Sequence, residues 1–341
     1  MTADAAGPAP TVCFACGEPV GATDSFCESC GAELAPLAVS DGRGGASPVC
    51  ESCSSERISP DGYCESCGQK VRSGRDHQEA DLGKVAGVTD RGLRHHRNED
   101  AMALATADTA AGPAVVAVVC DGVSSSARPD EASRVAAQAA LPVLVTAVQA
   151  GGDLGTASLA AVAAARQAIA DLQGPSGDTS ATTFVSAVAS GYEVTLCWLG
   201  DSRAYWLGQP AEESRLLTHD DSVAGGMVAA GLVDEAAAMA SPHAHVLTRW
   251  LGGEAADLAD DPERAPHVKR YTPPGAGALL ICSDGLWNYL ADAADLAGLA
   301  LPKALTDPLG AAADMVKFAV DAGGADNITV VLIPYLGPEA P

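Results

Sequence analysis

The feature that most restricts how this chain can fold is a set of four Cys-x-x-Cys pairs near its start. The last two pairs repeat the spacing of the first two, so that Cys50 lies 37 positions after Cys13. These short segments contain too few apolar residues for a core, so metal binding must drive their folding. Four thiolates in two such pairs form the soft, tetrahedral ligand set that zinc prefers. We therefore predict two zinc ribbons that bind two Zn²⁺ through Cys13, Cys16, Cys27 and Cys30, and through Cys50, Cys53, Cys64 and Cys67.

The alternative for these cysteines is a disulfide cluster, which requires an oxidising compartment. The first residues lack the basic and apolar regions of a signal peptide, and no uninterrupted apolar run is long enough to span a membrane. We therefore expect a cytoplasmic protein with reduced thiols. The remaining cysteines, Cys120, Cys197 and Cys282, end apolar runs and are interpreted as small buried residues.

The chain is strongly acidic, with 44 acidic and 20 basic residues and a formal net charge of −24. Nucleic acids and anionic membranes bind proteins through Lys and Arg, so neither is expected as a partner. Zinc ribbons can bind nucleic acid, but the acidic character extends over residues 1–76. Docking to a protein partner or a structural role is therefore the expected function of the ribbons.

Changes in composition divide the chain into segments. The predicted boundaries are a disordered N-terminus over 1–11, ribbons over 12–33 and 49–70, linkers over 34–48 and 71–81, a large folded domain over 82–336 and a tail over 337–341. In the large domain, strands are predicted near 84–89, 101–107, 114–120, 180–189, 192–199, 202–208, 277–283 and 327–334, and helices near 129–149, 154–173, 222–231, 234–240 and 308–322. Strands outnumber long helices and several are joined by hairpins, which predicts an α+β fold of antiparallel sheets covered by helices.

Acidic residues recur at the ends of the predicted apolar strands. Asp121, Asp201 and Asp284 each follow an apolar run, and Glu99 and Asp326 lie just before one. A single strand-end Asp is usually a turn residue, but five such positions in one domain favour a shared role. Converging carboxylates repel one another unless a cation lies between them, and hard divalent ions prefer oxygen ligands. We therefore predict Mg²⁺ or Mn²⁺ in this domain.

Eight short segments of this domain carry a more specific signal. They are 92–100, 118–122, 179–183, 200–205, 217–222, 247–252, 282–286 and 324–330, which include Arg-Asn-Glu-Asp, Thr-Ser-Ala-Thr-Thr and Gly-Asp-Ser-Arg. Their order and spacing resemble those of the PPM family of metal-dependent protein phosphatases, the type 2C class, in its bacterial members. The resemblance covers about residues 84–334. It implies that the large domain is a phosphatase catalytic domain with a central antiparallel β-sandwich flanked by helices.

The resemblance also implies roles for individual residues. The metal ligands would be Glu99, Asp121, Gly122, Asp201, Asp284 and Asp326. Asp121 would bridge two ions, Glu99 would act through a bound water, and Asp201 would belong to a looser third site. The implied reaction is hydrolysis of phosphoserine and phosphothreonine by a hydroxide that bridges the two metals, without a covalent intermediate.

The sequence departs from the family at the position of the Arg that grips the phosphate. That position holds His95, with Arg94 before it and Arg97 close by. Either His95 or a neighbouring Arg contacts the phosphate, so Arg94, His95 and Arg97 are the predicted phosphate site. With the metal ligands Asp121, Asp284 and Asp326, the predicted catalytic set also includes Arg94 and His95.

A second departure lies in the segment that corresponds to the family's flap, residues 218–246. The usual Asp-His-Ser is here Asp220-Asp221-Ser222. Three histidines flank this flap and are interpreted as surface or packing residues rather than ligands: His219, His243 and His245.

Two functions follow from the resemblance. The first is a phosphatase that acts on phosphoproteins made by a Ser/Thr kinase, and the alternative is a pseudophosphatase that binds phosphoproteins without turnover. The complete set of metal-binding Asp residues favours the enzyme, whereas His95 favours the binding protein.

Overall fold

The computed structural model describes most of the chain from residue 74 onward and short pieces before it. The described residues are 11–12, 19–20, 28–29, 37–39, 50, 53–59, 64–68, 74–110, 112–172, 179–252 and 265–337. The cysteines of the first predicted ribbon, Cys13, Cys16, Cys27 and Cys30, lie outside these residues. The first zinc ribbon therefore stays a prediction.

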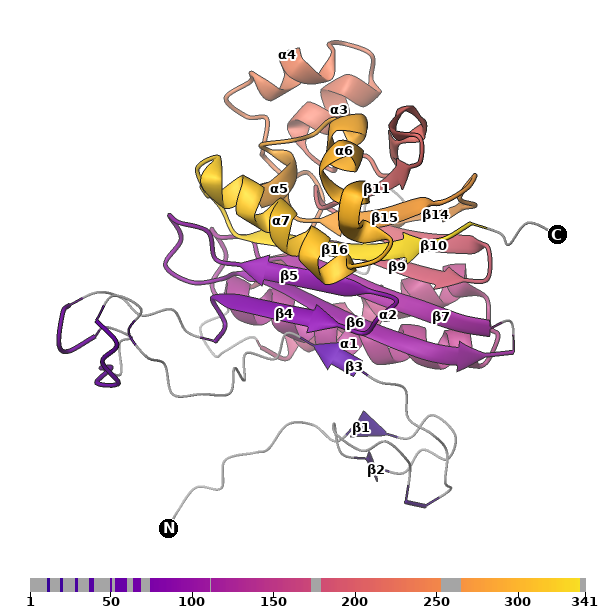
Figure 1. The fold of residues 1–341 in the computed structure, drawn as a ribbon, viewed down its shortest axis with the longest axis horizontal. Helices are drawn as coiled ribbons and strands as arrows, with labels where there is room; N and C mark the ends of the chain where they lie inside the picture. The colour runs from indigo at the N-terminus through magenta and orange to yellow at the C-terminus, as the bar shows by residue number, and fades with distance from the viewer. Residues whose placement is uncertain are drawn as a thin grey trace.

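Two six-stranded sheets form the centre of the described fold (Figure 1). In spatial order, the first sheet contains β14 (His267–Tyr271), β10 (Glu193–Leu199), β9 (Phe184–Ser190), β7 (Gly112–Asp121), β6 (Asp100–Thr109) and β3 (Leu37–Val39). The second contains β12 (Arg215–Leu216), β11 (Arg203–Gly208), β15 (Gly277–Cys282), β16 (Ile328–Tyr335), β5 (Ala86–Asp90) and β4 (His77–Asp81). Neighbouring strands in both sheets are antiparallel. The predicted α+β fold with antiparallel sheets is confirmed.

Strand β7 shows how the two sheets are held between layers of apolar residues. Its alternate residues Val115, Ala117 and Val119 belong to the core between the sheets. The residues between them, Val116 and Val118, pack into the core under the helices. Because both faces of the strand are buried, its sequence is a continuous apolar run rather than an alternating one.

Helices cover the outer face of each sheet. The helices of the described residues are α1 (Pro129–Gln149), α2 (Leu154–Ala170), α3 (Val223–Ala229), α4 (Glu235–Met239), α5 (Asp284–Trp287), α6 (Ala293–Ala304) and α7 (Pro308–Asp321), with a 3₁₀ turn η1 (Ala211–Glu213). Helices α1 and α2 pack on the first sheet, and α6 and α7 pack on the second (Figure 1). Helix α1 begins with Pro129, Asp130 and Glu131, residues that suit the first turn of a helix. Two further pairs of short strands are β1 (Thr11–Val12) with β2 (Pro19–Val20), and β8 (Ala181–Thr182) with β13 (Leu251–Gly252).

Several elements differ from the sequence prediction. Residues 77–81 were predicted as linker but form β4, which pairs with β5 at the edge of the second sheet. Similarly, β3 lies in the segment predicted as linker over 34–48 and pairs with β6. Strand β14 and helix α6 were not predicted. Edge strands such as β4 and β14 keep much of their surface exposed, so their polar sequences resemble those of loops.

The three cysteines outside the ribbons behave as predicted. Cys120, Cys197 and Cys282 are fully buried within the apolar layers. Among the described residues, no helix is both long and apolar enough to cross a membrane.

Candidate metal centre

Strand pairing brings the predicted metal ligands to one end of the sandwich. In the β6–β7 pair, Asp100 lies directly opposite Asp121. In the second sheet, β15 ends at Cys282, opposite Val330 near the start of β16. Asp284 therefore follows one strand at the same end at which Asp326 precedes the next. The same end also receives Asp201, because the adjacent strand β11 begins with Arg203 opposite Cys282.

Burial, together with the charges of neighbouring carboxylates, raises the pKa values of four Asp residues at this end: Asp100, Asp121, Asp201 and Asp284. Burial raises the pKa of Asp121 well above its usual range, and the neighbouring charges of Asp100, Asp284, Asp326 and Asp201 raise it further. The pKa of Asp284 is raised in the same way, first by burial and then by the charge of Asp201. Burial is also the main cause that raises the pKa of Asp100 and of Asp201 to about 7. A buried cluster of charged carboxylates is unfavourable at neutral pH unless protons or cations neutralise it.

Two of these carboxylates each have one anchored and one unpaired oxygen. Ser283 Oγ and Thr329 Oγ1 donate to Asp100 Oδ2 at 2.7 and 2.8 Å. Asn288 Nδ2 donates to Asp284 Oδ2 at 3.0 Å. The other oxygens, Asp100 Oδ1 and Asp284 Oδ1, are buried and have no hydrogen-bond partner among the described residues. Buried oxygens without a partner are what a site for a hard divalent ion requires, so the residues present fit such an ion.

Asp100 is a site residue that the sequence prediction omitted. It directly follows Glu99, and the residue is 7% exposed. The signal that points to it is the register of the β6–β7 hairpin, which places it beside Asp121. Sequence spacing alone does not give that register.

Glu99 is fixed by its side chain and by its backbone. Its carboxylate accepts from Ser124 Oγ at 2.5 Å and from Arg97 Nε at 3.0 Å. Its backbone N–H donates to Asn327 Oδ1 at 2.7 Å, and its carbonyl accepts from the N–H of Gly122 at 3.1 Å. These bonds hold the Glu99 loop between the end of β7 and the start of β16.

The two Asp-Gly pairs of the site are explained by close packing of the backbone. A Cβ on Gly122 would lie 2.4 Å from the carbonyl oxygen of Pro129. A Cβ on Gly285 would lie 1.9 Å from the carbonyl oxygen of Asn327. Only glycine allows the segments that carry Asp121 and Asp284 to approach so closely.

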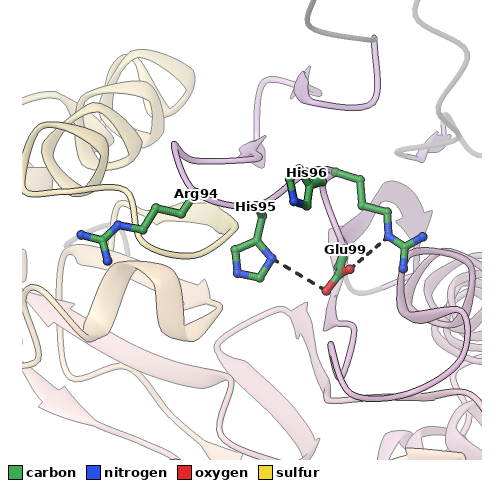
Figure 2. Close-up of a pocket in the computed structure, with 5 residues that line it drawn as sticks. Arg94, His95, His96 and Glu99 are labelled. Carbon is green, nitrogen blue, oxygen red and sulfur yellow. Dashed lines mark hydrogen bonds and ion pairs between the residues drawn. The ribbon is translucent and has the colours of Figure 1, made fainter. Parts of the chain in front are cut away.

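A pocket of about 480 Å³ lies beside the carboxylates, lined by Arg94, His95, His96, Arg97 and Glu99 (Figure 2). His95 Nε2 is 3.1 Å from Asp326 Oδ1, and His95 Nδ1 is 3.9 Å from Glu99 Oε2. Arg97 is engaged by two carboxylates, through Nε with Glu99 and through Nη1 with Asp130 Oδ1 at 3.3 Å. The Arg94 side chain points away from Glu99 (Figure 2). Of the predicted phosphate-binding residues, His95 therefore lies between two predicted metal ligands.

The cysteines of the second predicted ribbon lie together. The sulfur atoms of four cysteines all lie within 4.8 Å of one another: Cys50, Cys53, Cys64 and Cys67. The Sγ–Sγ distances are 3.4 Å for Cys50 and Cys67 and 3.5 Å for Cys53 and Cys64, too long for disulfides. Zn–S bonds of about 2.3 Å would place tetrahedral sulfurs roughly 3.8 Å apart. The cluster therefore fits a zinc ion.

Comparison with known protein families and sequences gives matches over this domain. The family model described as Protein phosphatase 2C matches residues 91–306. A curated relative, the serine/threonine phosphatase stp of Listeria innocua, is 32% identical over 155 residues, which make up 45% of this chain and 56% of that protein. The chain thus spans little more than half the length of that relative.

Solved structures share the fold over nearly their whole length. The PPM Ser-Thr phosphatase MsPP from Mycobacterium smegmatis, in complex with cacodylate, is 30% identical with a TM-score of 0.57, and the match covers 76% of this chain and 100% of that one. The catalytic domain of serine threonine protein phosphatase PstP, in complex with 2 manganese ions, is 26% identical with a TM-score of 0.55, and the match covers 74% and 97%.

Proposed function

Since the chain belongs to the protein phosphatase 2C family, we propose that it is a metal-dependent phosphatase that hydrolyses phosphoserine and phosphothreonine in proteins. The observation that carries this proposal is the convergence of Asp100, Asp121, Asp201, Asp284 and Asp326 at one end of the sandwich. The orphaned oxygens of Asp100 and Asp284 support a shared cation rather than a hydrogen-bonded structural cluster. The match to a phosphatase with 2 manganese ions supports Mn²⁺ or Mg²⁺ as that cation.

The proposed ligands are those implied by the sequence, Glu99, Asp121, Gly122, Asp201, Asp284 and Asp326, with Asp100 added because of its orphaned oxygen. When bound, the ions would supply Lewis acidity, which activates water and offsets charge on the phosphoryl oxygens. The chain's task is to hold the ligands in place. The Asp121 N–H donates to Thr183 Oγ1 at 3.0 Å, and the Asp121 carbonyl accepts from the Thr183 N–H at 2.7 Å. Preorganised ligands of this kind avoid reorganisation during the reaction.

The serines near the centre are positioned as hydrogen-bond donors rather than nucleophiles. Ser283 is fully buried and donates to Asp100, and its Oγ also accepts from the Thr329 N–H at 2.9 Å. Ser124 donates to Glu99. No side-chain base near them is needed, because the proposed reaction proceeds by direct attack of water without a covalent intermediate.

We propose that His95 contacts the phosphate directly, and that Arg94 and Arg97 supply positive charge to the pocket. His95 reaches toward Asp326 and Glu99, so its ring lies beside two of the residues that would hold the ions. Arg97 already pairs with Glu99 and Asp130. A phosphoryl group bound between the ions and this pocket would place its oxygens within reach of these donors.

The second cysteine cluster is proposed to bind one zinc ion and the first ribbon another, in docking or structural roles. The segment that follows the cluster contacts the phosphatase domain. Asp76 is 4% exposed and its carbonyl accepts from the Arg91 N–H at 2.7 Å. Arg75 pairs with Asp130 at 3.7 Å, the carboxylate that also binds Arg97. The ribbon would thus be attached to the domain through Arg75 and Asp76, near the phosphate pocket. This position suits docking of a phosphoprotein partner.

The proposed activity is tested with the purified full chain, Mn²⁺, and a phosphothreonine peptide. We expect phosphate release that a chelator abolishes, and loss of release in Asp121→Asn and Asp284→Asn. Asp314→Asn is a matched control, because Asp314 is an exposed residue of α7 that pairs only with Lys303 among the described residues. Binding of the phosphopeptide without any release in the presence of Mn²⁺ would instead support a pseudophosphatase.

A further inference from the structure

Outside the carboxylate centre, three side chains place potential metal-ligand atoms close to one another. One atom each from His219, Asp221 and His267 lies within 4.8 Å of the others. His219 and Asp221 come from the segment after β12, and His267 is the first residue of β14 in the other sheet. We propose that these residues bind a transition-metal ion, with zinc as the best match to the ligand set. The site goes beyond the proposed phosphatase function and does not depend on it.

The geometry at the His267 ring contains a conflict that a cation would remove. His267 Nε2 lies 2.9 Å from Asp221 Oδ1 and 2.8 Å from Arg249 Nη1. If Nε2 carries a proton, it donates to Asp221 but faces an N–H of Arg249. If Nε2 is unprotonated, it accepts from Arg249 but presents a lone pair to the Asp221 oxygen. An ion bound to both Nε2 and Oδ1 uses both lone pairs as ligands.

The guanidinium of Arg249 lies where it would compete with a metal ion for Asp221 and His267. Its Nη1 is 3.5 Å from Asp221 Oδ1. The Arg249 side chain is 26% exposed, so it can leave toward solvent when an ion binds. Zn–N bonds of about 2.0–2.1 Å would place ligand atoms roughly 3.3 Å apart, close to the 2.9 Å between His267 Nε2 and Asp221 Oδ1.

The ligand side chains are oriented by contacts on their far sides, as metal ligands usually are. Asp221 is 5% exposed, and its Oδ2 accepts from the Gly200 N–H at 3.1 Å, which leaves Oδ1 facing the histidines. The His267 ring stacks on Trp198 with centroids 4.9 Å apart. Trp198 Nε1 donates to the His219 carbonyl at 2.9 Å, so the same indole positions both histidines.

The chemistry of this site differs from that of the carboxylate centre. Two imidazoles and one carboxylate are a borderline-soft set that suits zinc, whereas an all-oxygen site suits Mg²⁺ or Mn²⁺. The two sites would therefore select different ions from the same solution.

The site is placed where an ion would stabilise the flap. Asp221 pairs through its backbone with Gly200, directly before Asp201, and with Thr248. Ser222, the next residue, caps α3 by accepting from the Gly225 N–H. An ion shared with His267 would join the start of the flap to the edge strand β14.

The test measures zinc retained by the full chain after dialysis. We expect the wild type to retain one more zinc per chain than the His219→Ala and His267→Gln variants. In these two variants, the zinc affinity of this site should fall on the order of 100-fold or more. His243→Ala is the matched control, because His243 is an exposed histidine of the same flap and should leave zinc content unchanged. The cysteine clusters and the carboxylate centre are present in every variant, so they cancel in the comparison.

Two further measurements keep the proposal falsifiable if one variant folds poorly. Arg249→Met should tighten zinc binding, because it removes the competing guanidinium. With Co²⁺, the spectrum of wild type minus that of His219→Ala should show visible d–d absorption without near-ultraviolet thiolate charge-transfer bands, because the thiolate sites contribute equally to both proteins. Equal zinc content in wild type, His219→Ala and His267→Gln, together with weaker binding in Arg249→Met, would overturn the site and leave an Arg249–Asp221–His267 cluster that is only structural.

Discussion

A buried ion pair between Arg203 and the start of the flap allows a quantitative prediction. Arg203 has a side chain that is 3% exposed, and it donates to Asp220 through Nε at 2.9 Å and through Nη2 at 2.8 Å. Its Nη1 donates to Tyr205 Oη at 3.1 Å, and its guanidinium lies 3.8 Å from the ring centroid of Trp287. Replacing Arg203 with Met would leave Asp220, whose side chain is 6% exposed, as an unpaired buried charge.

The expected loss follows from that geometry. Removing one partner of a buried, hydrogen-bonded pair costs about 3–5 kcal/mol. For a domain of this size, each 1 kcal/mol lowers the melting temperature by roughly 2–4 °C, so Arg203→Met should lower it by roughly 6–20 °C. Glu235 also accepts from Arg203 Nη2, at 2.9 Å, but its side chain is 51% exposed. Glu235→Gln should therefore cost less than about 1 kcal/mol.

The assay is thermal or urea unfolding of the full chain in a chelator, with a double variant to isolate the pair. Arg203→Met combined with Asp220→Asn should be more stable than Arg203→Met alone, because the second change removes the stranded charge. Equal, small losses for Arg203→Met and Glu235→Gln would refute the reasoning. So would a double variant whose loss equals the sum of the two single losses.

Three other predictions concern the metal centre. Folding raises the pKa values of Asp100 and Asp201 to about 7, so the folded, metal-free chain binds protons that the unfolded chain has released. This proton binding stabilises the fold at acid pH, and the stabilisation is lost as the pH rises through 7. The melting temperature in chelator should therefore fall from pH 5.5 to pH 8, and Mn²⁺ should raise it most at pH 8; a flat profile would count against the raised values. Gly285→Ala should cost about 1–3 kcal/mol and weaken Mn²⁺ binding, measured by calorimetry, because its Cβ would meet the Asn327 carbonyl; unchanged stability would contradict that packing. His95→Gln should lower kcat/KM for a phosphothreonine peptide by about 10–100-fold, and no change would remove His95 from the phosphate site.

The gathering of carboxylates at one end of the sandwich could be predicted from sequence because each of them directly precedes or follows an apolar strand. Val116 and Val118 belong to one layer of the core and Val119 to the other, so β7 was recognisable as a run that stops at Asp121. The position of Asp100 could not be predicted in the same way. It depends on the register between β6 and β7, which spacing does not determine.

The elements that were missed lie at the edges of the sheets. Strand β14 is mostly exposed, with Lys269 and Arg270 in its centre, so its sequence has no apolar signature. His267 begins that strand, and only the pairing of β14 with β10 places it opposite Trp198. The cluster of His219, Asp221 and His267 therefore arises from tertiary pairing, and His219 alone looked like a packing residue.

The most direct test of the metal centre is a crystal structure of the full chain grown with Mn²⁺, with anomalous scattering recorded at the manganese edge. We expect manganese peaks bonded to carboxylate oxygens of Asp121, Asp284 and Asp326, at distances of roughly 2.0–2.2 Å similar to those of other hard divalent ions. Carboxylates that instead share protons with one another, and no manganese among them although the ion is bound elsewhere, would contradict the account.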